Sequence, residues 1–483
     1  MIDISGVRTG LFIGGEWLAA QDTFTTHNPA TGAPLVELGA ASTADVDAAV
    51  AAATAAFRGE WGATAPSAKG ALINKLADLV ERDLDELAAL ESIDMGRPVG
   101  VSAAMMVPNL IGSLRYYAGW ADKINGELIT NDGYMGMAPT HAYTKREPLG
   151  VVAAIIPWNA PLMILGWKLG PALACGNTVI IKPAEDASLS ILKFAELVAE
   201  AGFPAGTVNV LPGRGAVAGE ALSLHPGVKK ISFTGSTATG RRILQNSAAT
   251  FKRTALELGG KAPQIVFEDA NLEAAIQGCA IGLFMNQGEV CAAGTRILAH
   301  RSVYDAVVDG LKGAAQAQVV GDPFDPATTM GPLVNASQRD KVAGYLKKGA
   351  DEGAQVVAGG SVPDVPGYFV EPTVFAGTNE MTVAREEIFG PVGIVIPFDS
   401  DEQAVALAND NEYGLSATIW TRDLSRAHTV SGQIESGAIG VNGWSPLAPQ
   451  LPWGGVKSSG IGRELGYEGI LAYTEPKTVT IVL

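Results

Sequence analysis

The sequence predicts an α/β protein built on two parallel β-sheets. The strand-like segments VVAAII, NTVIIK, TVNVL and KKISF alternate with helical segments beyond residue 145, and APQIVF, RILAH, GIVIPF and SATIW form a second series from about 265 to 440. Uninterrupted apolar strands separated by helices are typical of parallel sheets with helices on both faces. A chain of 483 residues is long enough for two or three such domains.

Helices are predicted before the first strand series. Residues 43–124 are Ala-rich, with Ser or Thr caps and acidic first turns. Residues 148–167 are uncharged and as long as a membrane span, but Pro157, Asn159 and Pro161 would interrupt a lipid-exposed helix. We interpret this stretch as a buried strand, a PWNAP turn and the start of a helix, and expect no membrane partner. The final stretch, EPKTVTIVL, is an isolated strand of a kind that often pairs with another subunit or a distant sheet.

Composition restricts the function classes. Acidic residues outnumber basic ones by 50 to 34, for a net charge of -16, and no segment concentrates Lys and Arg, so a nucleic-acid partner is not expected. The N-terminal stretch lacks the pattern of a secretory signal, so we expect a cytoplasmic protein. The five histidines lie outside metal-ligand spacing, and no metal site is expected. Three widely spaced cysteines predict free thiols.

The three cysteines have different settings. Cys279 belongs to an apolar stripe at helical spacing, which predicts a packed core side chain, and Cys175 at an apolar helix end is interpreted in the same way. Cys291 lies beyond the stripe in NQGEVCAAGTR, between Gly288 and Gly294, where an irregular loop can present a thiol to a pocket. A thiol with a pKa of about 8.5 is mostly protonated at neutral pH, so position alone does not establish a nucleophile. The stripe comprises Leu272, Ala275, Ile276, Cys279, Ala280 and Leu283.

Motifs along nearly the whole chain give Cys291 its context. FIGGEW, NPATG, PWN, KPAE, FTGS, LELGGK, NQGEVCAAGTR, EEIFGP, PWGGVKSSGIGRELG and YTEPKTV occur in the order and near the spacing of one superfamily. Each motif is weak alone, but the set is highly specific. The sequence resembles the NAD(P)-dependent aldehyde dehydrogenase superfamily, in its hydrolytic, non-acylating branch. The resemblance implies two Rossmann-like parallel-sheet domains plus a small β oligomerisation arm.

The resemblance also implies three catalytic residues. Cys291 matches the nucleophile, whose thiolate attacks the aldehyde to give a thiohemiacetal and then a thioester. Asn159 matches the residue that donates its amide to the oxyanion together with the Cys291 backbone N–H, although Asn159 also suits a turn between two prolines. Glu257 in LELGGK matches the general base that activates water against the thioester. In isolation, a glutamate at a strand end is usually a solvated charge.

The cofactor segment contains a fingerprint that we do not expect to be used in the ordinary way. Residues 213–218 follow a strand and match the dinucleotide pattern GxGxxA, but lysines occupy the region where an acidic residue is expected about 20 positions later. In the family the phosphates lie instead at FTGS, where a strand breaks at Gly235 and a helix begins near Ser236. The Glu185 carboxylate in KPAE would bind ribose hydroxyls and repel a 2′-phosphate, which favours NAD over NADP as the cofactor.

The implied cofactor-binding residues come from several of these motifs. Glu387 and Phe389 in EEIFGP correspond to residues that hold the nicotinamide ribose and ring, whereas alone they would indicate an ordinary loop before a strand. The full set comprises Ile155, Pro157, Trp158, Lys182, Glu185, Gly215, Phe233, Gly235, Ser236, Thr239, Leu258, Gly259, Glu387 and Phe389.

The expected aldehyde channel is apolar. Residues 442–455 carry no charge, and Lys168, the one evident cation, faces elsewhere if Trp167 faces the channel. Ala160 stands where a Phe is frequent in the family, and the neighbours of the nucleophile are small. We therefore expect a hydrophobic aliphatic, terpenoid or aromatic aldehyde; a semialdehyde would require a cation, and betaine aldehyde an aromatic cage with an acid. The lining set is Ala160, Met163, Trp167, Met285, Val290, Ala292, Leu447 and Trp453.

Three units are expected. In the family the β arm joins subunits, so a homodimer or homotetramer is expected. A non-catalytic dinucleotide-binding protein is an alternative, but it would not need Cys291, Glu257 and Asn159 together. A cysteine hydrolase has only distant histidines to offer. The boundaries are 1–125 with 149–259 for NAD binding, 260–455 for catalysis, and 126–148 with 464–483 for the arm.

Overall fold

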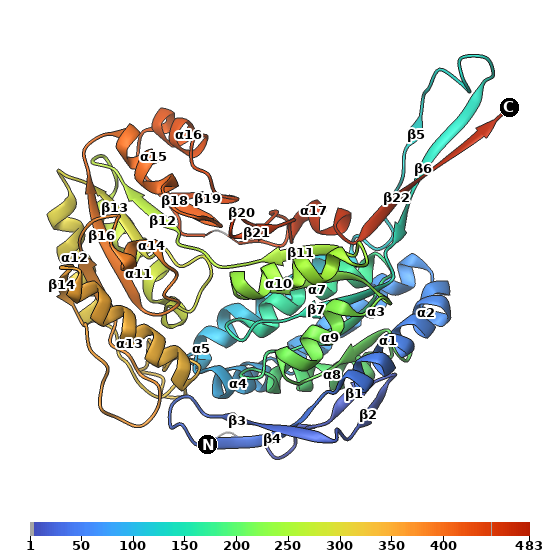
Figure 1. The fold of residues 1–483 in the computed structure, drawn as a ribbon, viewed down its shortest axis with the longest axis horizontal. Coiled ribbons are helices and arrows are strands. Elements are labelled where there is room, and N and C mark those ends of the chain that lie inside the picture. The colour runs from blue at the N-terminus through green and yellow to red at the C-terminus, as the bar shows by residue number, and fades with distance from the viewer. Residues whose placement is uncertain (1–3, 446) are drawn as a thin grey trace.

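The computed structural model describes residues 4–445 and 447–483, and its two large sheets confirm the predicted α/β class (Figure 1). The first sheet has eight strands, of which β9, β8, β7, β10 and β11 run parallel. Antiparallel strands extend it at both edges. The strand order is β2 (Glu16–Leu18), β1 (Leu11–Ile13), β9 (Val208–Val210), β8 (Thr178–Lys182), β7 (Val151–Ile155), β10 (Val228–Thr234), β11 (Arg253–Glu257) and β21 (Gly460–Ile461).

Helices cover both faces of this sheet because β7 is apolar on both sides. Val152 and Ala154 belong to a core with α3, α6, α7 and α8, whereas Val151 and Ala153 belong to a second core with α1 and α10. Ser42 caps α1 as the sequence predicts: its backbone amide donates to the Asp45 carboxylate at 2.8 Å. The helices are α1 (Thr43–Arg58), α2 (Glu60–Ala63), α3 (Pro66–Arg82), α4 (Leu84–Met95), α5 (Val99–Val101), the π-helix η1 (Ser102–Met106), α6 (Val107–Ala118), α7 (Pro161–Ala174), α8 (Leu189–Ala201), the π-helix η2 (Gly215–Gly219), α9 (Glu220–Leu224) and α10 (Thr237–Ala248).

The second sheet has seven strands, parallel except at β14. Its order is β14 (Gln355–Ala358), β15 (Thr373–Ala376), β16 (Val392–Phe398), β13 (Arg296–His300), β12 (Pro263–Val266), β18 (Ser416–Trp420) and β19 (Ala438–Val441). The helices of this unit are α11 (Leu272–Phe284), the 3-10 helix η3 (Met285–Gly288), α12 (Tyr304–Gln316), α13 (Ala336–Asp351), α14 (Thr382–Arg385), α15 (Asp401–Asn409) and α16 (Leu424–Ser431).

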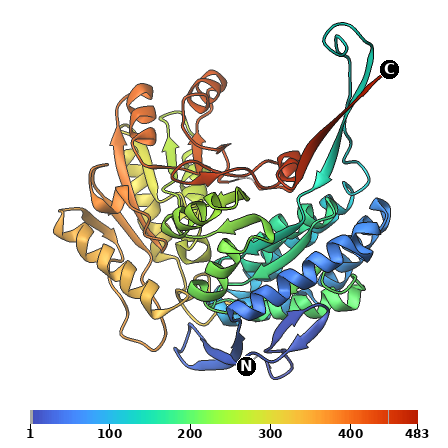
Figure 2. The same ribbon diagram turned by 45° about the vertical axis from the view of Figure 1, so that its right-hand side comes forward.

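A three-stranded arm projects from the body in both views (Figures 1 and 2). It consists of β5 (Leu128–Ile129), β6 (Thr140–Pro148) and β22 (Thr474–Val482), and β22 pairs with β6 along its whole length. The C-terminal strand therefore pairs with a distant segment of its own chain, and a short helix, α17 (Gly466–Leu471), precedes it. A role of the arm in joining subunits stays a prediction.

Two small sheets, each of two antiparallel strands, were not predicted. The pairs are β3 (Asp22–His27) with β4 (Pro34–Ala40), and β17 (Tyr413–Gly414) with β20 (Val456–Lys457). Among residues 4–445 and 447–483, no helix is long and apolar enough to cross a membrane.

Candidate active site

A cleft lies at the carboxyl ends of the first sheet's parallel strands. Ile155 ends β7, Lys182 ends β8 and Thr234 ends β10, so their following loops leave the sheet at one edge. Connections turn in opposite directions on either side of β7, and such switch points are where α/β proteins bind ligands. A cavity of about 470 Å³ opens here. Its walls include Ile155, Pro157, Trp158, Lys182, Glu185, Gly215, Phe233, Gly235, Ser236 and Thr239, all of them expected at the cofactor.

Glu185 is an ionised acceptor on the wall of this cavity. Lys182 Nζ lies 3.3 Å from Glu185 Oε2, and the Gly215 amide donates to Glu185 Oε1 at 2.7 Å. Burial works to raise the pKa of Glu185, but the charge of Lys182 and the Gly215 amide outweigh it, so the pKa is lowered. Because this fingerprint amide is bonded to Glu185, the structure supplies a physical reason to expect an unusual use of GxGxxA.

The FTGS turn forms a helix N-terminus beside the same cavity. Ser236 is the N-cap of α10: its hydroxyl accepts a hydrogen bond from the Thr239 amide at 3.3 Å and donates to Thr239 Oγ1 at 2.9 Å. The first amides of a helix carry a partial positive charge and suit an anionic group. The turn and Glu185 therefore fit the phosphates and a ribose of a dinucleotide, respectively.

A smaller cavity of about 180 Å³ lies next to the first, and its walls include Leu258, Gly259, Glu387, Phe389 and Cys291. The Gly260 amide donates to Glu387 Oε1 at 2.9 Å, and a Cβ on Gly259 would lie 2.5 Å from Glu387 Oε2. The Phe389 ring meets Trp158 edge-on, with ring centroids 5.2 Å apart. The LELGGK, EEIFGP and PWN motifs thus meet at one point beside the nucleophile candidate.

The loop before β13 presents Cys291, which is half-buried, whereas Cys175 and Cys279 are buried. Asn286 and Gln287 have φ of 52° and 56°, so the helix ends abruptly and the loop is irregular, as predicted. Burial, followed by the Glu257 and Glu387 carboxylates, raises the pKa of the Cys291 thiol to about 12. The thiol therefore needs a base to become a nucleophile.

Asn159 is held in place next to Cys291. Its side-chain amide donates to the Glu289 carbonyl at 2.9 Å, which leaves its second N–H for another acceptor. The main-chain carbonyl of Asn159 accepts hydrogen bonds from Arg97 Nη2 and, at 3.0 Å, from Asn286 Nδ2. Asn159 also lines both the small cavity and a second, adjoining cavity at the predicted aldehyde channel, which we call the tunnel. The side chain is fixed at the boundary between the two.

Arg97 is a central residue that sequence reasoning missed. Its guanidinium is fully buried, forms an ion pair with Glu91, and donates to Asn286 Oδ1 at 2.7 Å. Glu91 in turn accepts the Leu162 amide at the start of α7, at 3.0 Å. The pair therefore joins α4 to the loop that carries Asn159 and to the loop that carries Cys291. The only sequence signal was a charged pair in ESIDMGRP, which resembles the end of any surface helix.

Glu257 ends β11 and points into the tunnel. It is 3% exposed, and neither carboxylate oxygen has a hydrogen-bond partner among the described residues. Burial and then the nearby Glu464 carboxylate raise the pKa of Glu257 well above its usual value. A buried carboxyl group without local partners is available to exchange a proton with water or a thiol.

Behind Glu257 lies a second buried ion pair. Lys168 Nζ bonds to Glu464 and lies 3.2 Å from Ser232 Oγ, while Ser232 donates to Glu464 Oε1 at 2.9 Å. Trp167 faces the tunnel, so the prediction that Lys168 turns away from it is confirmed.

The tunnel, at the predicted aldehyde channel, is a cavity of about 570 Å³ that includes Cys291, Asn159 and Glu257 in its walls. Trp444 closes one side, and its Nε1 donates to the Ala292 carbonyl at 3.2 Å. The expectation that no arginine faces this cavity is wrong, because Arg97 reaches its wall from a distant helix end. All expected lining residues are present: Ala160, Met163, Trp167, Met285, Val290, Ala292, Leu447 and Trp453.

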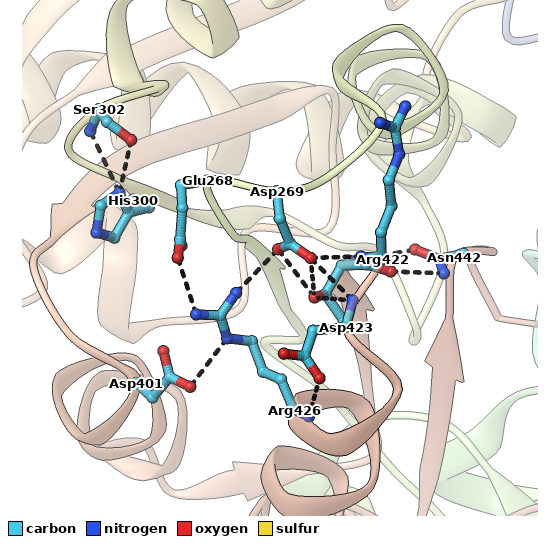
Figure 3. A network of polar contacts seen from close by, with 10 residues as sticks. Glu268, Asp269, His300, Ser302, Asp401, Arg422, Asp423, Arg426 and Asn442 are labelled. Atoms are coloured by element: carbon cyan, nitrogen blue, oxygen red, sulfur yellow. Dashed lines mark hydrogen bonds and ion pairs between the residues drawn. The ribbon is translucent and has the colours of Figure 1, made fainter.

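A polar network anchors the loop that carries Trp444 (Figure 3). Arg426 bonds to Asp269 after β12 and to Asp401 at the start of α15, both at 2.9 Å. Asp269 accepts the Thr421 hydroxyl at 2.9 Å, and Asn442 Nδ2 donates to the Thr421 carbonyl at 2.8 Å. The network thus connects the ends of β12, β18 and β19 at the start of the tunnel loop. It contains no group of His, Cys, Asp or Glu placed to hold a metal, nor does any other described part of the chain.

Known proteins share this architecture. Residues 17–479 match the model of the aldehyde dehydrogenase family. The mitochondrial aldehyde dehydrogenase of Homo sapiens is 45% identical over 98% of this chain and 91% of that protein, and retinal dehydrogenase 2 of Gallus gallus is 44% identical over 98% and 92%. The NAD+ complex of an aldehyde dehydrogenase from Bacillus cereus superposes with a TM-score of 0.96 at 44% identity, covering 99% of this chain and 97% of that one. The chain belongs to the aldehyde dehydrogenase family.

Proposed function

We propose that the protein uses NAD+ to oxidise a hydrophobic aldehyde to its carboxylic acid through a thiohemiacetal and a thioester on Cys291. One observation carries this proposal: Cys291 and Asn159 line both the small cavity on the cofactor side and the apolar tunnel. A carbonyl carbon bound at that boundary would meet the thiol from the tunnel and an oxidant from the other side. Family membership and the NAD+ complex of the Bacillus cereus neighbour support the same assignment.

The residues divide the chemistry between them. The buried Glu257 carboxylate removes the proton of the Cys291 thiol, and the thiolate then attacks the aldehyde carbonyl. The free N–H of Asn159 stabilises the resulting oxyanion together with the Cys291 backbone amide. Bound NAD+ would supply the hydride acceptor. After the first proton has passed from Glu257 to solvent, the carboxylate deprotonates a water molecule that attacks the thioester. The C–S bond breaks, the carboxylic acid leaves, and Glu257 returns the proton to the Cys291 thiolate.

The cofactor cleft favours NAD over NADP. Glu185 is held ionised, so it would accept hydrogen bonds from ribose hydroxyls and repel a 2′-phosphate. Glu387 is anchored by the Gly260 amide and would hold the second ribose. We assign cofactor binding to the unit around the first sheet (1–125 and 149–259), and the nucleophile to the second unit (260–455).

The tunnel favours a hydrophobic aldehyde. The guanidinium of Arg97 is engaged by the Glu91 carboxylate, the Asn286 side chain and the main-chain carbonyl of Asn159, so it is not free to bind a substrate carboxylate. A semialdehyde is therefore disfavoured. The name of the Gallus gallus relative, retinal dehydrogenase 2, shows that a terpenoid aldehyde is assigned to a similar protein.

The arm favours a homodimer or homotetramer. Leu128, Met137 and Leu483 are 74%, 80% and 74% exposed on it, which is unusual for apolar side chains that stay in water. A thiol nucleophile also favours a reducing compartment such as the cytoplasm.

An aldehyde panel tests the proposal. Purified protein is mixed with NAD+ or NADP+ and octanal, benzaldehyde, acetaldehyde or succinic semialdehyde, and the absorbance of the reduced cofactor is followed. We expect higher kcat/KM for octanal and benzaldehyde, and for NAD+ over NADP+. Failure to reduce either cofactor with any aldehyde would contradict the reaction, whereas a preference for succinic semialdehyde would contradict only the substrate class.

A further inference from the structure

The helix that precedes the nucleophile loop has an unexplained outer face. Ala275, Cys279 and Leu283 of α11 are buried against the second sheet, as predicted. Ile276 and Ala280, which the apolar stripe placed on the same buried face, are instead half-exposed. They line a groove of about 810 Å³, so the buried stripe is narrower than predicted.

The groove has apolar side chains on both sides. Ile276, Ala280 and Ile281 of α11 lie on one side, and Ala314 and Ala317 at the end of α12 lie on the other. Uncharged polar side chains also line it: those of Gln277, Gln318 and Thr329, of which the Thr329 hydroxyl donates to Gln318 Oε1 at 2.9 Å. The single ionisable side chain on the described walls is that of Glu273, at the beginning of α11. From Glu273 to the end of α11 the groove extends over about 16 Å of helix. Its chemistry suits an uncharged, elongated apolar group.

The groove begins where the aldehyde tunnel reaches the surface. Ile281 and Met285 line both the groove and the tunnel, and Ile281 is 46% exposed. Cys291 lies on the same tunnel wall as Met285. A chain attached to a carbonyl at Cys291 can therefore pass Met285 and Ile281 and continue along α11.

We propose that this groove, between α11 and the end of α12, binds the distal alkyl tail of a long, unbranched aldehyde whose proximal carbons fill the tunnel. The proposal rests on the proposed function and narrows its substrate class to long-chain aliphatic aldehydes. Each methylene removed from water raises kcat/KM by up to about fourfold. Because the groove is open on one side, methylenes that lie there contribute less than those in the tunnel.

The test compares chain lengths in two alanine variants. Ala317→Glu places a carboxylate on the groove wall without touching a tunnel residue, and Ala306→Glu makes the same change at an exposed position near the start of the same helix. For the wild-type protein we expect kcat/KM to rise from hexanal through octanal to dodecanal. Ala317→Glu is expected to lower the dodecanal value by about tenfold and leave hexanal unchanged, and Ala306→Glu is expected to change neither.

Two results would overturn the proposal that the groove binds the alkyl tail: no gain in kcat/KM of the wild-type protein beyond octanal, or equal losses of kcat/KM for hexanal and dodecanal in Ala317→Glu. Failure of the proposed function would be recognised separately, because hexanal would not be oxidised either. In that case calorimetric binding of dodecan-1-ol and hexan-1-ol decides the question. Equal affinity of wild type and Ala317→Glu for dodecan-1-ol would then reject the proposal.

Discussion

The two sides of Cys291 are built in different ways. On the cofactor side, Lys182 and Thr234 end β8 and β10, the parallel strands on either side of β7, and main-chain amides of short motifs supply several of the contacts. On the aldehyde side, the walls come from η1, α7, α11 and the loop after β19, which meet only through tertiary packing. The carboxyl ends of parallel strands lie at one edge of a sheet, so the sheet itself brings the cofactor-side residues together, whereas the tunnel depends on how helices and loops pack. A substitution on the cofactor side should therefore affect mainly its own contact, and a substitution on the aldehyde side should also displace neighbouring residues.

The largest effect should come from the residue that both sides share. Cys291→Ala removes the nucleophile, and kcat for aldehyde oxidation should fall by about 10⁴-fold or more. NAD+ binding, measured by fluorescence titration, should be retained because the contacts proposed for the phosphates and the adenosine ribose lie at the first sheet, away from the Cys291 side chain. The matched control is Cys279→Ala, in the core of α11, which should preserve activity at some cost in stability. Substantial aldehyde oxidation by Cys291→Ala would refute the covalent mechanism.

Glu257→Gln should reduce kcat by about 10² to 10⁴-fold. Because burial and the Glu464 carboxylate raise the pKa of Glu257 well above its usual value, its carboxylate form becomes populated at higher pH than that of a free glutamate. The wild-type rate should therefore increase with pH over a range above the one in which a free glutamate titrates. Steady-state kcat measured against pH should lose this rise in Glu257→Gln but keep it in Glu468→Gln, an exposed control. A rise that persists in Glu257→Gln would assign it to another group.

Substitution of Arg97 tests whether a change on the aldehyde side affects residues beyond the one replaced. Arg97→Met leaves Glu91 buried and unpaired, and should lower the free energy of unfolding by about 3 to 5 kcal/mol. Lys347→Met breaks the exposed pair with Asp351 and should cost less than about 1 kcal/mol. Urea unfolding of both variants measures the difference.

If Arg97→Met does not fold, Arg97→Lys can be used instead. It retains the charge but lacks the forked guanidinium that reaches both the Asn286 side chain and the Asn159 main-chain carbonyl. Its kcat/KM should fall by about tenfold, with Kd for NAD+ unchanged. The double variant Arg97→Lys with Asn159→Ala should be no slower than Asn159→Ala alone, because Arg97 acts through Asn159. Additive losses would show that Arg97 acts by another route.

Cofactor choice should respond to a single side chain. Glu185→Ser removes the carboxylate that would repel a 2′-phosphate, and the preference for NAD+ over NADP+ should fall by about tenfold. The ratio of kcat/KM values for the two cofactors, with octanal as substrate, measures this. Glu220→Ser, another acid on the cavity wall but paired with Arg242, is the control. An unchanged ratio in Glu185→Ser would place the discrimination elsewhere.

The smallest effect should come from the tunnel beside the nucleophile. Ala160→Phe restores the bulk that is frequent in the family, and should lower kcat/KM for benzaldehyde by a few-fold, on the order of 1 kcal/mol, with little effect on acetaldehyde. Equal effects on both aldehydes would indicate displacement of Asn159 rather than narrowing of the tunnel.

Regular strands were predictable, and with them much of the cofactor side. VVAAI is apolar on both faces and could only be a central strand, and KPAE and FTGS follow strands whose ends must share one edge. The hairpin of β3 and β4 was missed because β3, DTFTTH, carries a mixed polar pattern. Ile276 and Ala280 were misplaced because helical periodicity identifies an apolar stripe without showing how wide a neighbour covers it.

By itself, the sequence determined the α/β class, the strand ends that carry Lys182 and Glu257, and the irregular loop around Cys291, because these depend on local periodicity and backbone punctuation. Only the tertiary structure decided that Arg97 lies under Asn159, that Glu257 is buried beside Glu464, and that α11 leaves a groove open at the tunnel mouth. These features join residues far apart in the chain. Their energies come from desolvation and packing, which no local pattern specifies.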